Sequence, residues 1–139
     1  MNYKKKIYWG VAISVGAFFL SIVLAKPEIF GLCNYNDMKC IYNYIDIFDS
    51  IAQFVGLFSI AFFIIFSIIL FCKELVFNYW KKFAKIFLSV AIILILITPT
   101  QYGGFVGIDK EMVTWGLASL FLISSLGIII WKSIQLRKK

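Results

Sequence analysis

Hydrophobic residues fall into four long runs, and polar residues gather between them. Three runs, Ile7–Ala25, Ile51–Cys72 and Met112–Trp131, contain no Asp, Glu, Lys or Arg, and a neutral segment continues the fourth, Ile86–Thr98. Each complete run holds about 20 residues, which at ~1.5 Å per residue crosses the ~30 Å hydrocarbon layer of a bilayer. The pattern predicts an all-α integral membrane protein, a four-helix bundle.

The same pattern predicts a single transmembrane domain over residues 1–139. The expected elements are helices at about 7–25, 41–72, 80–98 and 110–134, outer loops at 26–50 and 99–109, and an inner connection at 73–85. Pro27 and Pro99 should end the first and third helices, because proline lacks the N–H that continues a helix. Asp109 is expected to cap the fourth helix. The glycine-rich loop before it lies either on the membrane surface or dips into the membrane.

Positive charge is concentrated between alternate runs. The chain has 14 Lys and Arg against 7 Asp and Glu, and most of the basic residues lie at Lys4–Lys6, Lys73–Lys85 and Lys132–Lys139. By the positive-inside rule, both termini are cytoplasmic and two loops are outside. The composition is typical of a multi-pass protein of the bacterial cytoplasmic membrane. The basic clusters should meet anionic lipid headgroups at the inner face, and nucleic acid is not an expected partner.

The first run also has the features of a signal peptide. Lys4–Lys6 precede it, and Val23–Ala25 resemble a small-residue cleavage site. The apolar run is longer than a usual signal-peptide core, so we expect a retained first helix.

Small residues recur at helical spacing in the first two helices. They form one stripe in each helix and are Gly10, Ser14, Ala17 and Ser21, followed by Ala52, Gly56 and Ser59. Such stripes let two helix backbones approach closely in lipid, where hydrophobicity alone does not drive association. We expect helix-packing faces here, although chance spacing is the alternative. The pattern does not distinguish a contact within the bundle from one with another subunit.

Tryptophans stand near the ends of the predicted spans. Trp115 marks the outer interface, and Trp9, Trp80 and Trp131 mark the inner one. Tryptophan is enriched at both membrane–water interfaces, so all four are expected to be interface anchors.

Cys33 and Cys40 lie in the first outer loop, and Cys72 lies at the inner end of the second helix. The outside of the bacterial membrane permits disulfides, so a structural Cys33–Cys40 disulfide is expected. The alternative is a redox-active pair. Four-helix quinone oxidoreductases that reoxidise thiol oxidases also have outer cysteines, but they need a C-x-x-C pair and a second pair, which this chain lacks.

Other chemistry finds little support in the sequence. The chain has no His, which excludes Ser-His-Asp and Cys-His catalytic sites and leaves too few ligands for a zinc site. No ionisable residue lies at membrane depth, which disfavours a proton relay or an exporter that depends on a buried Glu. We therefore expect no enzyme, no cofactor and no metal.

Several segments together resemble a family of uncharacterised small four-helix bacterial integral membrane proteins with no assigned activity. The similar segments are YNYIDIFDSI, VFNYWKKFAK and GGFVGIDKEMVTWGLASLFLISSLGIIIWKSI. The resemblance implies the same topology, and it brings no activity with it.

Three functions fit these observations. The first is a non-enzymatic accessory or structural subunit of a membrane assembly, with protein subunits or further copies of the chain as partners. The second is a holin-like pore or membrane-permeabilising protein, suggested by the small size and the basic tail Lys132–Lys139. The third is a membrane thiol oxidoreductase that uses Cys33 and Cys40.

Overall fold

The chain is all-α in a computed structural model that describes residues 3–26, 31, 33, 38–98 and 110–137. Its described part contains four long helices. They are α1 (Tyr3–Ala25), α2 (Met38–Ile69), α3 (Glu74–Ile97) and α4 (Lys110–Arg137). The predicted all-α fold is confirmed.

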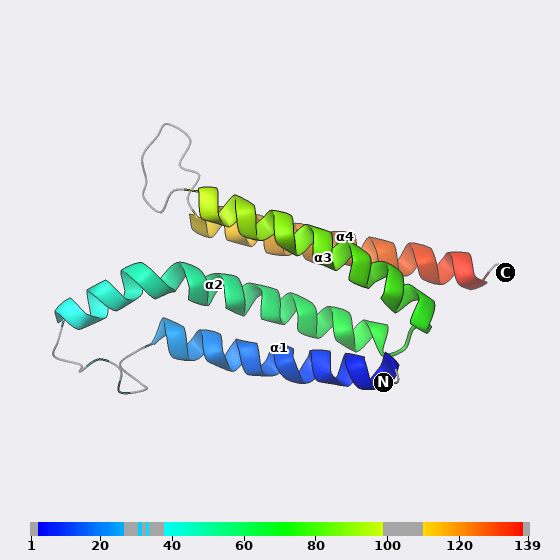
Figure 1. Cartoon of the computed structure of the whole chain (residues 1–139), viewed down its shortest axis with the longest axis horizontal. Coiled ribbons are helices and arrows are strands. Elements are labelled where there is room, and N and C mark those ends of the chain that lie inside the picture. The colour runs from blue at the N-terminus through cyan, green and yellow to red at the C-terminus, as the bar shows by residue number, and fades with distance from the viewer. Residues whose placement is uncertain (1–2, 27–30, 32, 34–37, 99–109, 138–139) are drawn as a thin grey trace.

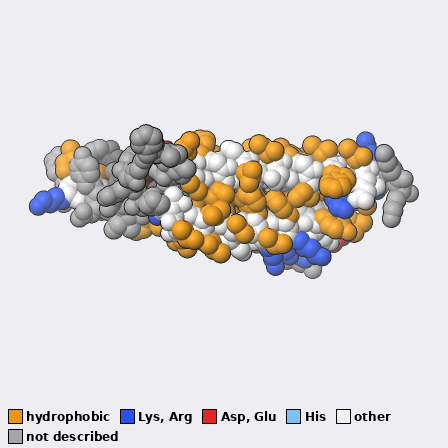
Figure 2. Space-filling view, turned by 90° about the horizontal axis from the view of Figure 1, so that it is seen from above, with side chains coloured by type: hydrophobic (Ala, Val, Ile, Leu, Met, Phe, Trp, Pro, Cys, Tyr) orange, Lys and Arg blue, Asp and Glu red, His pale blue; other side chains and the backbone are white. Residues whose placement is uncertain are grey.

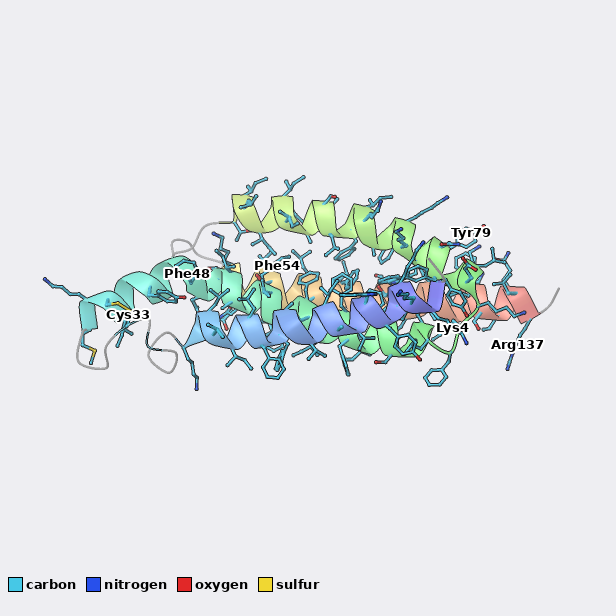
Figure 3. The ribbon with its side chains drawn as sticks, turned by 60° about the horizontal axis from the view of Figure 1, so that its bottom comes forward. Lys4, Cys33, Phe48, Phe54, Tyr79 and Arg137 are labelled. Atoms are coloured by element: carbon cyan, nitrogen blue, oxygen red, sulfur yellow. A yellow bond between two sulfur atoms is a disulfide. The ribbon has the colours of Figure 1, made fainter. Side chains whose placement is uncertain are left out.

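The helices run alternately up and down, so both ends of the described chain lie together with the α2–α3 connection (Figure 1). We call this the basic end, because it carries Lys4–Lys6, Lys73 and Arg137. The opposite end, with Cys33 and Cys40, is the disulfide end. Lys4 and Arg137 lie far from Cys33 in the side-chain view (Figure 3). Which end faces the cytoplasm stays a prediction.

Packing between helices does not follow the order of the chain. Helix α1 packs along α2, α2 contacts α4, and α4 contacts α3. Figure 1 shows α1 and α2 as one antiparallel pair, with α3 and α4 together on the other side. Helix α1 is therefore peripheral, and it buries only Ile7, Ser14 and Ser21.

Three helices are long and apolar enough to cross a membrane, namely α1, the Phe48–Ile69 part of α2, and α4. Helix α3 differs because its first half carries Lys81, Lys82 and Lys85. Its charge-free remainder extends only about 18 Å at ~1.5 Å per residue, less than a hydrocarbon layer. Membrane crossing by α1, α2 and α4 fits the structure, whereas crossing by α3 stays a prediction.

Figure 2 shows hydrophobic side chains along the middle of one face of the molecule, with most of the blue Lys and Arg side chains toward one end. Many large apolar side chains of α1, α3 and α4 are exposed, including Phe19, Ile97 and Ile123. Such a surface is costly in water and normal in lipid. This supports assignment as a multi-pass membrane protein.

The inner connection at 73–85 was predicted wrongly. Helix α2 ends at Ile69. The amides of Phe71 and Cys72 beyond it donate to the carbonyls of Ile68 and Ile69, three residues earlier, and α3 begins at Glu74. The amphipathic stretch is thus the start of a continuous helix. Its apolar side buries Val76, Phe77, Trp80 and Ala84 against the bundle instead of facing headgroups.

Other boundaries differ less from the prediction. Helix α1 begins at Tyr3 and ends at Ala25, α2 begins at Met38, and α4 continues to Arg137. Helix α3 ends at Ile97, and Thr98 before Pro99 has the extended conformation (φ −72°, ψ 130°) that proline imposes on its predecessor. The predicted loop at 99–109, including the Asp109 cap, lies outside the described residues.

One hydrophobic core joins the helices, and aromatic rings fill its middle. Its buried members are Ile7, Phe58, Ala61, Ile65, Ile69, Val76, Phe77, Trp80, Ala84, Ala91, Ala118, Phe121 and Ile129. Phe121 of α4 is fully buried, and its ring centroid lies 5.1 Å from that of Phe62 and 5.2 Å from that of Phe87. These rings fill the space between α2, α3 and α4.

Candidate functional site

The predicted disulfide between Cys33 and Cys40 is present. The two Cα atoms are 5.9 Å apart, and Cys40 lies in the first turn of α2. Cys33 is buried, and Gly31 before it adopts a positive φ of 70°, which glycine allows without strain. The bond anchors the chain before α2 to the start of that helix, as expected for a structural crosslink.

The third cysteine cannot exchange directly with this pair. Cys72 lies just beyond the other end of α2, whose 32 residues extend about 48 Å at ~1.5 Å per residue. Its thiol is free and donates a 3.6 Å hydrogen bond to the Ile68 carbonyl. Burial raises the pKa of the Cys72 thiol, which makes it a poor nucleophile at neutral pH. The two sulfur sites therefore do not form an electron relay.

The small residues of α1 and α2 lie at the contact between these helices. A Cβ built on Gly10 would come within 2.7 Å of the Phe66 ring, and one on Gly56 would come within 3.0 Å of Ser21 Oγ. Ser14, Ser21, Ala52 and Ser59 are buried, and Ala17 is half-buried. Both stripes thus contribute to packing inside one chain.

Hydroxyl groups along this contact bond to their own helices. Ser14 donates to the Gly10 carbonyl at 2.8 Å, Ser21 to the Phe18 carbonyl at 2.7 Å, and Ser59 to the Val55 carbonyl. Within the described residues, no buried side-chain nitrogen or oxygen lacks a partner. The contact therefore presents no unpaired polar group for a ligand.

The four tryptophans separate into two environments. Trp9, Trp115 and Trp131 are 58%, 54% and 71% exposed, which suits interface anchors. Trp80 is only 3% exposed. The prediction that it faces the lipid headgroups is therefore wrong. Its ring packs edge-on against Phe66, with centroids 5.2 Å apart, and its Nε1 donates a 3.1 Å hydrogen bond to Ser125 Oγ. This correction follows from the helical phase of α3, whose inner side carries Trp80.

The buried Trp80–Ser125 pair is the feature that sequence reasoning missed. Ser125 is fully buried in α4, and it satisfies the indole N–H in an otherwise apolar region. A serine at a core position of a membrane helix is a weak signal by itself. Its partner lies 45 residues away, so only the packing of α3 on α4 reveals the pair.

Shallow grooves run between the helices. One of about 240 Å³ lies between α1 and α2 and is lined by Ser14, Phe18 and Phe63. A larger one, of about 420 Å³, lies between α2 and α4 beside Ala61, Ala118 and Ser119. Their walls are almost entirely apolar, so they offer dispersion contacts rather than reactive groups.

Metal ligands do not gather in the described part of the chain. No group of three Cys, Asp or Glu side chains there could hold a metal ion. Asp49 accepts a 3.4 Å hydrogen bond from Gln53 on its own helix. Asp37, the acid between the two bonded cysteines, lies outside the described residues.

Comparison with protein-family models, curated proteins and solved structures finds no match in any of the three. The resemblance to small four-helix bacterial membrane proteins therefore stays a prediction.

Proposed function

We propose that the chain is a non-enzymatic accessory or structural subunit of a membrane assembly. The observation that carries the proposal is the composition of the interior. Phe58, Phe62, Phe83 and Phe87 surround Phe121 with ring centroids 5.1 to 6.2 Å away, and the nearby Trp80–Ser125 pair is satisfied internally. An interior filled by rings supplies rigidity and shape rather than a reactive centre.

The surface supports the same function. The apolar outer sides of α1, α3 and α4 leave packing as the main way in which this chain can interact within a bilayer. Three exposed glycines, Gly16, Gly116 and Gly127, have no atom within 4 Å of a built Cβ. A side chain added at these positions starts in open space, so each position can report an intermolecular contact.

The test is to extract the protein at native abundance into polymer-bounded lipid discs and identify co-purifying proteins by mass spectrometry. We expect a stoichiometric companion. We also expect that at least one of Gly16→Leu, Gly116→Leu and Gly127→Leu releases it without lowering the melting temperature of the chain. Gly10→Leu is unsuitable for this purpose, because Gly10 contacts Phe66 within the chain.

Recovery of the chain alone, or only as a homo-oligomer, would contradict the accessory role. Ion leakage from liposomes containing the purified protein would then favour the holin-like alternative, with the conducting path between copies. Loss of thiol oxidation in a Cys33→Ser/Cys40→Ser variant would favour the oxidoreductase alternative. If the companion protein still co-purifies with that variant, the disulfide is not required for the proposed role.

A further inference from the structure

A pocket of about 190 Å³ opens at the basic end, between the α2–α3 connection and the last turns of α4. Seven residues from these two segments and the start of α3 line it. They are Phe71, Cys72, Lys73, Val76, Ser133, Leu136 and Arg137. This is the most polar of the grooves and pockets described above, and it differs from the lateral grooves in carrying two cationic side chains.

The cations in this pocket are not neutralised within the described chain. Lys73 and Arg137 come from different elements, and neither forms an ion pair with a described residue. The basic residue nearest to them on α4, Lys132, is instead engaged by Gln135 Oε1 at 2.8 Å and by the Tyr79 ring at 4.3 Å. Two positive charges that share one cavity favour an anion between them.

Neutral donors add to this preference. Lys73 is the N-cap residue of the 24-residue helix α3, and its side chain makes no capping hydrogen bond. In the first turn, the Val76 amide donates to the Lys73 carbonyl at 3.0 Å, and Glu74 contributes a carboxylate. Free amides and the helix dipole give a helix N-terminus partial positive charge. The Ser133 hydroxyl lines the same pocket and makes no hydrogen bond within the described residues. The donor set therefore matches a group with several acceptor oxygens, such as a phosphate.

The remaining walls indicate how that phosphate is attached. Val76 is buried, Leu136 is half-buried, and Phe71 beside them is 92% exposed. The pocket lies just beyond the end of the α2 span at Ile69, at the depth of lipid headgroups. An apolar flank at this depth suits the glycerol and first acyl carbons of a lipid, whereas a free anion gains nothing from it.

From this geometry we propose that the basic-end pocket binds the phosphate of an anionic phospholipid. Lys73, Arg137 and Ser133 hold the headgroup, and Phe71 and Leu136 contact the acyl region. The inference rests on the membrane location of α2 and α4, and it is independent of the proposed partner subunit.

The test is native mass spectrometry of the full chain in mild detergent, titrated separately with phosphatidylglycerol and phosphatidylcholine. We expect tighter binding of phosphatidylglycerol. The Lys73→Gln/Arg137→Gln variant should bind it roughly 30-fold more weakly, because each substitution removes one direct charge-assisted contact to the phosphate. Lys81→Gln/Lys82→Gln is the matched control, because it removes the same charge from exposed positions of α3 outside the pocket. It should retain most of the affinity.

A second variant, Ser133→Leu, fills the pocket without changing the charge and should also weaken binding. Circular dichroism melting establishes that each variant is folded. Equal losses in the two double-glutamine variants would show unspecific surface attraction and overturn the proposal, as would unchanged binding to Ser133→Leu. Displacement of the lipid by an equal concentration of inorganic phosphate would assign the pocket to a free anion and overturn the lipid assignment.

Discussion

At the scale of single residues, the contact between Trp80 and Ser125 distinguishes the core from the apolar surface. A tryptophan followed by Lys81 and Lys82 is typical of a membrane interface, which is why Trp80 was predicted to lie there. Its indole N–H nevertheless lies at a buried position and needs an acceptor. The Ser125 hydroxyl is that acceptor, and the hydrogen bond joins α3 to α4.

Replacing Ser125 by alanine should destabilise the bundle. The Ser125→Ala variant leaves the Trp80 indole N–H buried without a partner, and we expect a loss of about 1 kcal/mol in the free energy of unfolding. Unfolding in mixed micelles, followed by circular dichroism, measures the loss. Ser89→Ala is the control, because Ser89 is exposed and bonds only to the Lys85 carbonyl. A cost for Ser125→Ala that persists unchanged in a Trp80→Phe background would contradict the role of the hydrogen bond.

At the scale of elements, the pairing of α1 with α2 depends on two glycines on facing helices. Gly10 accommodates the tip of the Phe66 ring, and Gly56 faces Ser21. The Phe66 ring is also packed against Trp80, so it cannot move freely away from Gly10. The α1–α2 contact is thereby coupled to the aromatic core, although α1 itself contributes little to that core.

Gly10→Ala and Gly16→Ala should have opposite effects on stability. The added methyl group at Gly10 meets the Phe66 ring at 2.7 to 2.9 Å, and overpacking of this kind costs about 1–3 kcal/mol. Gly16 has no atom within 4 Å of a built Cβ, so alanine there should gain up to about 1 kcal/mol from helix propensity. Thermal melts of the two variants in one detergent provide the comparison. Equal stability of the two variants would show that α1 does not pack on α2 as described.

At the scale of the whole molecule, the chain is polarised from end to end. Both described termini, the α2–α3 connection and Cys72 lie at the basic end, whereas the disulfide and the start of α4 lie at the other (Figures 1 and 3). Positive residues favour the cytoplasmic side and disulfides favour the oxidising side, so both arguments give the same orientation. Cys72 can report on it, because it is the free thiol of the three cysteines.

A membrane-impermeant maleimide should label Cys72 in inverted vesicles and leave it unlabelled in intact bacterial spheroplasts. Burial raises the pKa of this thiol, so the reactive thiolate fraction at neutral pH is below that of an ordinary cysteine. Labelling should accelerate as the pH rises toward and beyond the ordinary thiol pKa. The control is Glu111→Cys in a Cys72→Ser background, which places an exposed thiol at the opposite end and should show the reverse sidedness. Labelling of both positions from one side would contradict the orientation.

The sequence by itself determined the helices and their order. Continuous apolar runs, two prolines and the charge pattern predicted the all-α fold and the existence of four helices, because these features act locally or through the solvent. The Cys33–Cys40 disulfide was also predictable, since the two residues are close along the chain. The sequence did not predict the boundaries at the α2–α3 connection. An amphipathic segment has the same sequence pattern whether its apolar side packs against lipid or against another helix.

Only the tertiary structure decided which apolar side is the inner one. In a soluble protein polar residues mark the outside, but in lipid both sides of a helix are apolar, so periodicity loses its meaning. Burial of Trp80, its bond to Ser125, the fit of Phe66 over Gly10 and the meeting of Lys73 with Arg137 in one pocket all join residues far apart in the chain. Each depends on the rotation of one helix against another, which packing determines.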